Sequence, residues 1–594
     1  MSKKKSMNVP SKKKKSSTFK MLFKIIKPIK WFALLGVICA AISTILYVVG
    51  PSILNEMMQV VGSADFNLKT VNTLGLILVA IYLCSMIASY FEGFIMSKVS
   101  TTITKDLRTK ISKKINKLPL KYFDKTSYGD ILSRVTNDVD TVGRTLNNSL
   151  TGLVTSVVTI IAIPIVMFTL SWQLTLISLI EIPLAFLVIF LIVKFNQKYY
   201  VQQQKSLGDL NGHIEEIYSS HNVVKAFNGE ERSITKFNKL NNTLRTSARK
   251  AQFTSNLMHP IINTVGNIIY VAICLFGAMI AINRGDPLFF TSIITFITYI
   301  KMFNQPLSQL GMLAGNLQQT AAAAGRVLEF VEEDEEPDES HLKKTIKNVK
   351  GKVEFDHVTF GYDKDNPIIH DFCFTAQPGQ KIAIVGPTGA GKTTMVNLLM
   401  RFYEVDGGDI KIDGVSTKKM NRSYVRSLFG MVLQDTWLFE GTIKENIAYG
   451  KQDATDEEII RACKMANVDH FIRTEPDGYN HVITEDSAIS QGQKQLFTIA
   501  RAMVQNAPML ILDEATSSVD TRTEVLIQQA MDKLTEGRTS FVIAHRLSTI
   551  KNSDKIIVMK DGSIVEIGSH DELMSKDTFY KELYNSQFTA GQEI

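Results

Sequence analysis

The sequence predicts a multi-domain chain: an all-α membrane domain of six transmembrane helices with long cytoplasmic helical extensions, then a soluble α/β domain built on a phosphate-binding loop. Three observations support this fold class. Apolar runs long enough to cross a bilayer fill the first half of the 594 residues, and none follows about residue 310. A buried-strand pattern enters a glycine-rich loop at 381–394. A second apolar strand ends in two acids at 509–514.

The apolar runs predict six membrane spans joined by two very short turns and two long polar connections. The short turns lie near Ser171 and at Asn283–Asp286. A span needs about 20 predominantly apolar residues, and each run meets that length. The six runs are 31–54, 71–93, 150–170, 172–194, 261–283 and 287–307.

The first 30 residues are rich in lysine and contain no acidic residue, so the net charge of +8 is partly concentrated there. A nucleic-acid-binding tail is one interpretation of this segment. A cytoplasmic flank of the first span is the preferred one, because lysine-rich flanks remain on the cytoplasmic side. Residues 16–30 mix Phe, Leu and Ile with Lys, which predicts a helix lying in the membrane interface.

The two long connections, 95–149 and 195–260, keep apolar residues at helical spacing. We therefore expect the membrane helices to project far into the cytoplasm, with breaks near Asp124–Gly129 and near Ser219–Asn222. Residues 332–349 are charged and lack periodicity, which predicts a linker. The resulting domains are 1–30 (basic N-terminus), 31–331 (membrane domain), 332–349 (linker) and 350–594 (nucleotide-binding domain).

Few polar side chains interrupt the apolar runs. Glu181 lies in the fourth run beside Pro183, at a depth where an acid usually faces a cavity or a partner. Contact with a transported substrate is one hypothesis, and packing against a polar neighbour in the helix bundle is the other. Asn263, Asn267 and Lys301 are weaker candidates for the same cavity.

The segment KIAIVGPTGAGKTT has a short apolar strand running into a complete phosphate-binding loop. Glycines let the backbone turn its N–H groups toward phosphate, and the following helix adds the positive end of its dipole. Lys392 would neutralise the outer phosphates of ATP, and the hydroxyl of Thr393 would ligate Mg²⁺. The predicted ATP-binding residues here are Gly386, Pro387, Thr388, Gly389, Ala390, Gly391, Lys392, Thr393 and Thr394.

The segment MLILDE is predicted to be a second buried strand ending in Asp513 and Glu514. Asp513 would hold Mg²⁺ through its water shell, and Glu514 would orient or deprotonate the attacking water. Capping of a helix is the alternative role for this acid pair. Upstream, SQGQKQLFTIARAM begins with Ser490, which can cap an amphipathic helix.

In this order the motifs resemble those of an ABC exporter half-transporter, over almost the whole chain. By this resemblance Tyr362 stacks on adenine, Gln434 is the Q-loop glutamine near Mg²⁺, and His545 is the switch histidine that senses the γ-phosphate. Asp520 is the acid of the D-loop. Residues 122–140 and 223–231 resemble the coupling regions. The family signature, which contacts ATP held by a partner chain, corresponds to Ser490, Gln491, Gly492 and Gln493.

The resemblance implies a dimer in a bacterial cytoplasmic membrane, with the ATPase domain in the cytoplasm. Each ATP would lie between one chain's phosphate loop and the other chain's signature. Closure of the two ATPase domains would switch the membrane domains from inward- to outward-facing, and hydrolysis would reset them. The expected substrate is amphipathic or hydrophobic: a drug, a lipid or a peptide.

The signature departs from the family pattern, because Gln491 stands where the family has a glycine. A side chain at this position should loosen contact with the opposite nucleotide. We therefore predict a heterodimer with a second half-transporter that has an intact signature and a substituted catalytic glutamate. A homodimer remains the alternative.

A nucleic-acid-acting ATPase and a nucleotide-gated channel are the two alternative function classes. A soluble-type ABC ATPase acting on nucleic acid would use the lysine tail, but six apolar runs argue against it, so no nucleic-acid partner is expected. A nucleotide-gated channel or regulatory subunit would not need both Glu514 and His545. Transport against a gradient would separate a pump from a channel.

Overall fold

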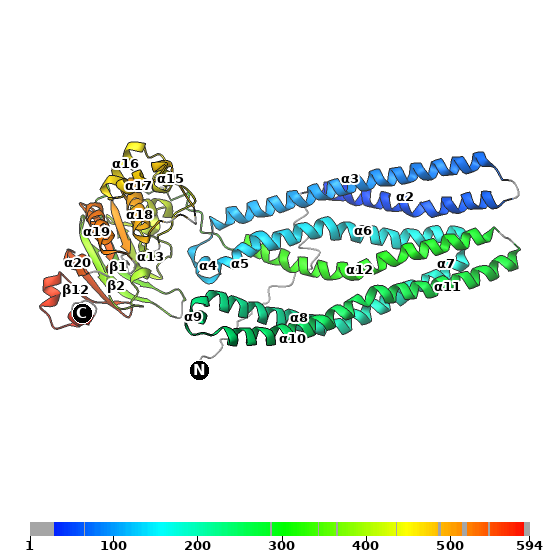
Figure 1. Cartoon of the computed structure of the whole chain (residues 1–594). Coiled ribbons are helices and arrows are strands. Elements are labelled where there is room, and N and C mark those ends of the chain that lie inside the picture. The colour runs from blue at the N-terminus through cyan, green and yellow to red at the C-terminus, as the bar shows by residue number, and fades with distance from the viewer. Residues whose placement is uncertain are drawn as a thin grey trace. The chain divides into compact units, whose positions relative to one another are not determined.

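Figure 1 shows the computed structural model of the chain. It describes residues 29–586 apart from 64–65, 286–287, 343, 364–365, 435, 485–486, 488, 514–518 and 545–546. All but the last two residues of the predicted interfacial helix, 16–30, therefore lie outside the described residues. The chain divides into two compact units. Unit 1 comprises the residues up to Leu118 with Thr126–Asp334, and unit 2 comprises Pro119–Lys125 with Glu335 onward.

Unit 1 is built from long helices that run side by side over much of their length (Figure 1). The 48 residues of α3 correspond to about 72 Å at 1.5 Å per residue, far more than a hydrocarbon core of about 30 Å. The predicted helical extensions are thus present. The main helices are α2 (Lys30–Gly62), α3 (Leu68–Ile115), α6 (Val139–Leu170), α7 (Trp172–Leu179), α8 (Glu181–Ser219), α10 (Glu230–Asn256), α11 (Met258–Arg284) and α12 (Phe289–Val331).

The predicted breaks in the two extensions are confirmed. The first extension passes through α4 (Leu120–Lys125) and α5 (Tyr128–Ser133), and Ser127 between them accepts a hydrogen bond from the Asp130 N–H to cap α5. A single π-turn at Arg134–Asp138 then leads into α6. The second extension breaks on both sides of α9 (His221–Ala226).

Length and composition make five helical stretches of the described residues apolar enough to cross a membrane. These five contain the first five predicted spans. The sixth prediction, 287–307, falls in α12, which is long enough but is not among the five. Lys301, Asn304 and Gln305 interrupt its apolar sequence. Since α12 packs against α6, α11 and α2, neighbouring helices bury much of its surface.

Buried polar contacts fix the helices of unit 1 relative to one another. The Tyr299 hydroxyl on α12 donates to the Val48 carbonyl oxygen on α2 over 3.0 Å. Near the C-terminal end of the same helix, Arg326 forms an ion pair with Asp138, whose side chain is 8% exposed. These contacts give α12 a defined register despite its mixed composition, since buried polar groups must be hydrogen-bonded.

Unit 2 contains a six-stranded sheet in the order β12-β11-β3-β10-β9-β6 and a four-stranded antiparallel sheet in the order β2-β1-β4-β5. In the larger sheet the five strands from β11 to β6 are parallel, and β12 is antiparallel to β11. Central strands such as β3 and β9 are almost wholly apolar and buried, as expected for a parallel sheet covered on both faces. The strands are β1 (Val353–Phe360), β2 (Ile369–Ala376), β3 (Lys381–Val385), β4 (Gly407–Ile412), β5 (Val415–Ser416), β6 (Phe429–Val432), β9 (Met509–Asp513), β10 (Thr539–Ile543), β11 (Lys555–Lys560) and β12 (Ser563–Gly568).

A short β7–β8 pair and a set of helices complete unit 2. Its second hydrophobic core joins the helices between β6 and β9 to the buried faces of those strands. These elements are α13 (Lys392–Leu399), α14 (Arg422–Ser427), β7 (Gly441–Thr442), α15 (Ile443–Ala448), α16 (Asp456–Met465), α17 (Asp469–Thr474), β8 (Val482–Ile483), α18 (Gln491–Gln505), α19 (Thr521–Thr535), α20 (Leu547–Lys551), α21 (His570–Met574) and α22 (Phe579–Tyr584).

Two segments that come from outside the sequence range of the ATPase fold belong to unit 2. One is α4, whose Asp124 accepts a hydrogen bond from the Tyr403 hydroxyl. The other is the second part of the predicted linker, where the buried Glu339 pairs with Arg401 at 2.8 Å and with Arg422 at 2.8 Å. Residues 335–349 are thus held on the domain, because a buried carboxylate needs such partners.

Candidate active site

Two glycines of the phosphate loop have a left-handed backbone conformation. Gly389 and Gly391 have φ values of +87° and +99°, which side-chain-bearing residues rarely adopt. A Cβ at Gly391 would also lie 2.8 Å from the Ile369 Cδ1 atom. Left-handed backbone of this kind is what a phosphate-binding loop needs to turn its N–H groups toward an anion.

Lys392 begins α13 and folds its side chain back over the loop. Its Nζ atom donates to the carbonyl oxygens of Gly386 at 2.7 Å and Pro387 at 3.1 Å. Burial lowers the pKa of Lys392, and the charge of Asp513 opposes this shift. No side chain caps α13. Its first N–H groups are thus available to an anion beside a cationic group, which is the arrangement that binds phosphate.

The parallel strands bring the remaining predicted groups to one edge of the sheet. Asp513 ends β9, and Gln434 follows the neighbouring strand β6 by two residues. Asp513 pairs in register with Ile543, near the end of β10, which is itself the neighbour of β3. Because parallel strands share the edge at their carboxyl ends, Gln434, Asp513 and the phosphate loop lie along one edge of the sheet.

Two predicted catalytic residues, Glu514 and His545, lie outside the described residues. Their strands are described, however. Glu514 follows directly on β9, and His545 comes two residues after β10.

The predicted adenine-stacking residue, Tyr362, rests on two aromatic rings and on α13. Its ring packs edge-on against Phe360 and Tyr403, with centroid distances of 5.1 Å and 4.9 Å. Its hydroxyl accepts a hydrogen bond from the Asn397 Nδ2 atom at 3.2 Å and lies 3.4 Å from the Thr394 hydroxyl. The structure thereby connects Tyr362 to the phosphate-loop helix.

Sequence reasoning missed Tyr403 and Asn397. Both lie close in sequence to the phosphate loop, but no pattern in RFYE or in the helix α13 distinguishes them from core residues. Only the pairing of β1 with β4 and the fold of α13 place them beside Tyr362.

The signature segment forms a capped helix start, which confirms the predicted role of Ser490 as a cap. The Ser490 hydroxyl accepts from the Gln493 N–H at 3.2 Å, and Gln493 Oε1 accepts from the Ser490 N–H at 2.8 Å. Gly492 is buried, and a Cβ there would lie 2.4 Å from Thr523. The side chain of Gln491 is directed to its own domain, where Nε2 donates to the Thr436 hydroxyl at 3.0 Å.

The predicted D-loop acid, Asp520, caps the next helix. Its Oδ1 atom accepts from the Thr523 N–H at 2.9 Å, and this backbone hydrogen bond lowers the pKa of the Asp520 carboxyl group. Thr523 also lies so close to Gly492 that no side chain would fit between them. The starts of α18 and α19 are therefore packed together.

These residues fit a magnesium-bound nucleoside triphosphate. Thr393 lies exposed on the first turn of α13, and Gln434 is exposed beyond β6, so both side chains are free to reach a ligand in the crevice. Thr393, Asp513 and Gln434 would hold Mg²⁺, a hard cation that prefers oxygen ligands. When bound, the ion neutralises charge on the β- and γ-phosphates.

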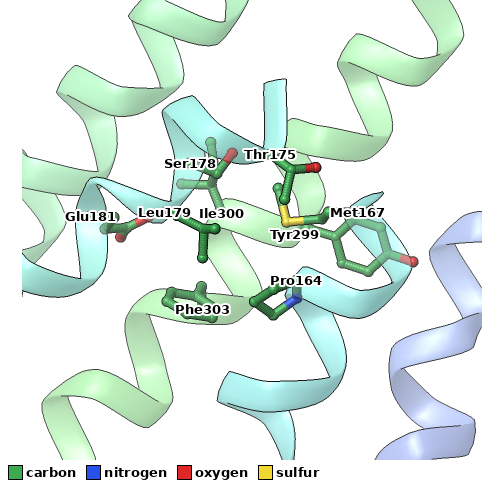
Figure 2. A pocket seen from close by; sticks show the side chains of 9 residues that line it. All are labelled: Pro164, Met167, Thr175, Ser178, Leu179, Glu181, Tyr299, Ile300 and Phe303. Atoms are coloured by element: carbon green, nitrogen blue, oxygen red, sulfur yellow. The ribbon is translucent and has the colours of Figure 1, made fainter. Parts of the chain in front are cut away.

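The polar residues predicted for a membrane cavity are separated in unit 1. Glu181 is 1% exposed and lines a small cavity between α6, α7, α8 and α12, shown in Figure 2. Asn263 is half-buried and Asn267 exposed, both on α11. Neither these two residues nor Lys301, which is exposed on α12, lines that cavity.

Comparisons with known proteins match both units. The family model described as ABC transporter transmembrane region matches residues 33–307, and the model described as ABC transporter matches residues 369–517. The chain is 44% identical over 527 residues to a fatty acid ABC transporter ATP-binding/permease protein of Mycobacterium tuberculosis, covering 89% of this chain and 83% of that one.

Two further comparisons extend over nearly the whole chain. An ATP-dependent lipid A-core flippase of Syntrophus aciditrophicus is 35% identical over 591 residues, covering 97% of this chain and 96% of the relative. The solved structure of a bacterial Atm1-family ABC exporter with ATP bound superimposes with a TM-score of 0.75 at 26% identity, covering 95% and 99% of the two chains.

The chain therefore belongs to the ABC transporters and is an ABC exporter half-transporter. It is a multi-pass membrane protein with an ATP-hydrolysing domain, and exporters of this kind act as dimers within the membrane. The fold class predicted from the sequence is confirmed.

Proposed function

We propose that this chain is one half of a dimeric exporter that uses ATP hydrolysis to move a lipid-like amphiphile across the cytoplasmic membrane. The supporting observation is the joining of two parts in one chain. Unit 2 gathers Lys392, Asp513 and Gln434 at the phosphate-binding edge of a parallel sheet, and unit 1 contains helices apolar and long enough to span a bilayer.

In the proposed reaction the chain's own side chains position ATP and the attacking water. Lys392 binds the outer phosphates, and Tyr362 stacks on the adenine ring. Glu514 accepts the proton of the water, while His545 and Gln434 contact the γ-phosphate region and its ion. The signature residues Ser490 to Gln493 and the D-loop Asp520 would complete the site of a partner chain.

The substrate class is supported by the relatives and by a second cavity. Two relatives are named for lipidic substrates, fatty acid and lipid A-core. An open groove of about 380 Å³ in unit 1 has a volume in the range of small-molecule sites. Among its described lining residues hydroxyl and amide groups predominate and none is charged, which suits a polar head group: Ser43, Thr44, Tyr47, Ser85, Met86, Ser89, Thr155, Ser156, Thr159, Met302, Gln305, Pro306 and Gln309.

We also propose that the working unit is a heterodimer. The phosphate loop is complete in sequence and conformation, whereas the exposed Gln491 changes the surface of the signature. A partner with an intact signature would complete the site formed by Lys392, Asp513 and Glu514 of this chain. The partner's own nucleotide would face the altered signature and be hydrolysed more slowly.

Reconstitution in proteoliposomes tests the function. ATP should drive accumulation of a fluorescent fatty acid or phospholipid analogue on the side opposite the ATPase domain, above the level reached with ADP. Glu514→Gln should retain ATP binding and lose most transport, because an amide cannot accept the proton of the water. Transport that continues at the wild-type rate in this variant would contradict the assigned role of Glu514.

The groove is tested by an isosteric pair of variants. Thr155→Val removes a hydroxyl group that lines the groove, and Thr169→Val removes one on the exposed surface of the same helix. We expect the concentration of lipid that half-maximally stimulates the ATPase activity of the assembled transporter, this chain with its partner, to rise in the first variant alone. Equal values in the two variants would exclude Thr155 from the substrate site.

The heterodimer proposal is tested by purifying this chain alone in lipid nanodiscs. We expect weak ATPase activity that lipid does not stimulate, and recovery when a half-transporter with an unaltered signature is co-expressed. Robust, lipid-stimulated hydrolysis by a stable homodimer would overturn the heterodimer while leaving the exporter in place.

A further inference from the structure

The small cavity that contains Glu181 is too small for the proposed substrate. It leaves about 10 Å³ for the centre of a water-sized sphere, roughly the room for one water molecule or one small ion. Figure 2 shows its walls, contributed by α6, α7, α8 and α12. The lining residues are Pro164, Met167, Thr175, Ser178, Leu179, Glu181, Tyr299, Ile300 and Phe303.

Glu181 is the only acid among the residues that line this cavity, and it has no compensating partner. Its side chain is 1% exposed, and its Oε1 atom is buried without a hydrogen-bond partner. No ion pair involving Glu181 is found among the described residues. A buried carboxylate in the membrane half is costly unless a partner group, an ion or a proton neutralises it.

The hydroxyl groups that line the cavity do not donate hydrogen bonds to Glu181, because each donates to a backbone carbonyl oxygen. The Thr175 hydroxyl donates to the Ser171 carbonyl oxygen at 2.6 Å, and the Ser178 hydroxyl donates to the Leu174 carbonyl oxygen at 2.9 Å. The Tyr299 hydroxyl is the other titratable group of the lining. It points away from Glu181 in Figure 2 and donates to the Val48 carbonyl oxygen. Toward the cavity these hydroxyls can therefore offer lone pairs alone.

A helix break lies at the same place. α7 ends at Leu179 and α8 begins at Glu181. Pro183 has no N–H, so it cannot donate to the Leu179 carbonyl as a residue of an unbroken helix would. The junction is thus a proline kink in one membrane span, and a carbonyl oxygen that lacks its helical partner can join an acid in coordinating Na⁺ or H⁺.

We propose that Glu181 forms a monovalent-cation site at the α7–α8 break, occupied by Na⁺ or by a proton on the carboxyl group. An enclosure with acceptor oxygens on its walls and one uncompensated carboxylate calls for a positive charge, and a neutral water would leave that charge in place. The room available admits a single small ion. The inference rests on residues of unit 1 and does not depend on which substrate is transported.

The test uses the purified full-length transporter in lipid nanodiscs, free of nucleotide. Its thermal unfolding is followed while Na⁺ replaces choline at constant ionic strength. If Na⁺ is the ligand, the Tm of the wild type rises with Na⁺, since a ligand that binds the folded state stabilises it. Glu181→Gln should lose this rise. Glu56→Gln, which removes an exposed acid from the same unit, should keep it.

A second measurement identifies the proton. The infrared carbonyl band of a protonated carboxylic acid should be present in the wild type and in Thr175→Val, and absent from Glu181→Gln, if the proton is the occupant. The Tm would then be insensitive to Na⁺. The proposal is overturned if wild type and Glu181→Gln show the same Na⁺ response and the same carboxylic-acid band. Because neither readout needs transport or ATPase activity, failure of the proposed function would not affect this result.

Discussion

Two helices of unit 2, the phosphate-loop helix α13 and the signature helix α18, both begin at a motif that contains glycine, but their first turns are completed differently. At α13 the residue before the helix is Gly391, with φ of +99° and no side-chain cap. At α18 the residue before the helix is Ser490, which forms a capping box with Gln493. The first N–H groups of α13 are thus left to a ligand, whereas at α18 the capping box satisfies the N–H groups of Ser490 and Gln493 internally.

This difference indicates two ways of meeting a nucleotide. The start of α13 is preorganised for phosphate by its backbone, and it depends on the ligand to complete its hydrogen bonds. The start of α18 is held in shape by its own capping box, without a ligand. A substitution at the start of α13 is therefore expected to change nucleotide affinity. A substitution at the start of α18, where Gln491 lies, is expected to change the shape of the surface that meets the partner's nucleotide.

The largest effect is expected from Lys392→Ala. This change removes the ammonium group that lies over the loop, and charge-assisted hydrogen bonds are worth about 1.5–3 kcal/mol. ATP affinity should fall by roughly tenfold to a hundredfold, measured with a fluorescent ATP analogue. Lys444→Ala, a surface lysine of the same unit, is the control. An unchanged Kd in Lys392→Ala would show that the backbone alone holds the nucleotide.

The next effect is expected from alanine at the loop glycines. Gly391→Ala and Gly389→Ala share the cost of a left-handed conformation, about 1–2 kcal/mol. At Gly391 the new methyl also meets Ile369, whereas at Gly389 no atom lies within 4 Å. Gly391→Ala should therefore weaken ATP binding more than Gly389→Ala does. Adding Ile369→Val, which deletes the contacted Cδ1 atom, should restore part of the loss; no rescue would mean that backbone strain alone is responsible.

A smaller effect is expected from Ser490→Ala, which removes the cap of α18. Loss of such a cap costs about 1 kcal/mol of stability, and denaturant unfolding would measure it. Thr455→Ala removes an equivalent capping box from α16 and should cost a similar amount. Turnover of the assembled transporter should fall in Ser490→Ala and not in Thr455→Ala. Equal turnover in both variants would show that the start of α18 contributes to folding alone.

The smallest change in stability is expected from Gln491→Gly. It removes one exposed hydrogen bond, to Thr436, worth about 1 kcal/mol or less. Turnover of the chain purified alone should rise, because backbone at the signature could then approach the opposite nucleotide. Thr436→Val breaks the same hydrogen bond but keeps Gln491. If Thr436→Val raises turnover equally, the hydrogen bond that holds the Gln491 side chain, rather than the size of that side chain, limits hydrolysis.

Much of the fold could be predicted from the sequence because its signals are local. Apolar runs of fixed length give the spans, and helical spacing in the polar connections gives the extensions that α3 and α8 form. The phosphate loop is equally local, since its glycines are needed by the conformation of the loop itself. The cap at Ser490 follows from its own four residues. The sixth span was harder to recognise from composition. It lies in α12, which is stabilised by buried contacts with neighbouring helices that composition does not show.

The sequence by itself determined the order of domains, the phosphate loop and the acids that follow the second buried strand, since each depends on residues adjacent in the chain. Only the tertiary structure decided which residues surround them. Tyr403 reaches Tyr362 because strand pairing folds distant segments together, and Glu339 joins unit 2 because buried arginines neutralise it. Glu181 has no polar partner because each neighbouring hydroxyl donates to a backbone carbonyl, a result of helix packing that sequence spacing does not contain.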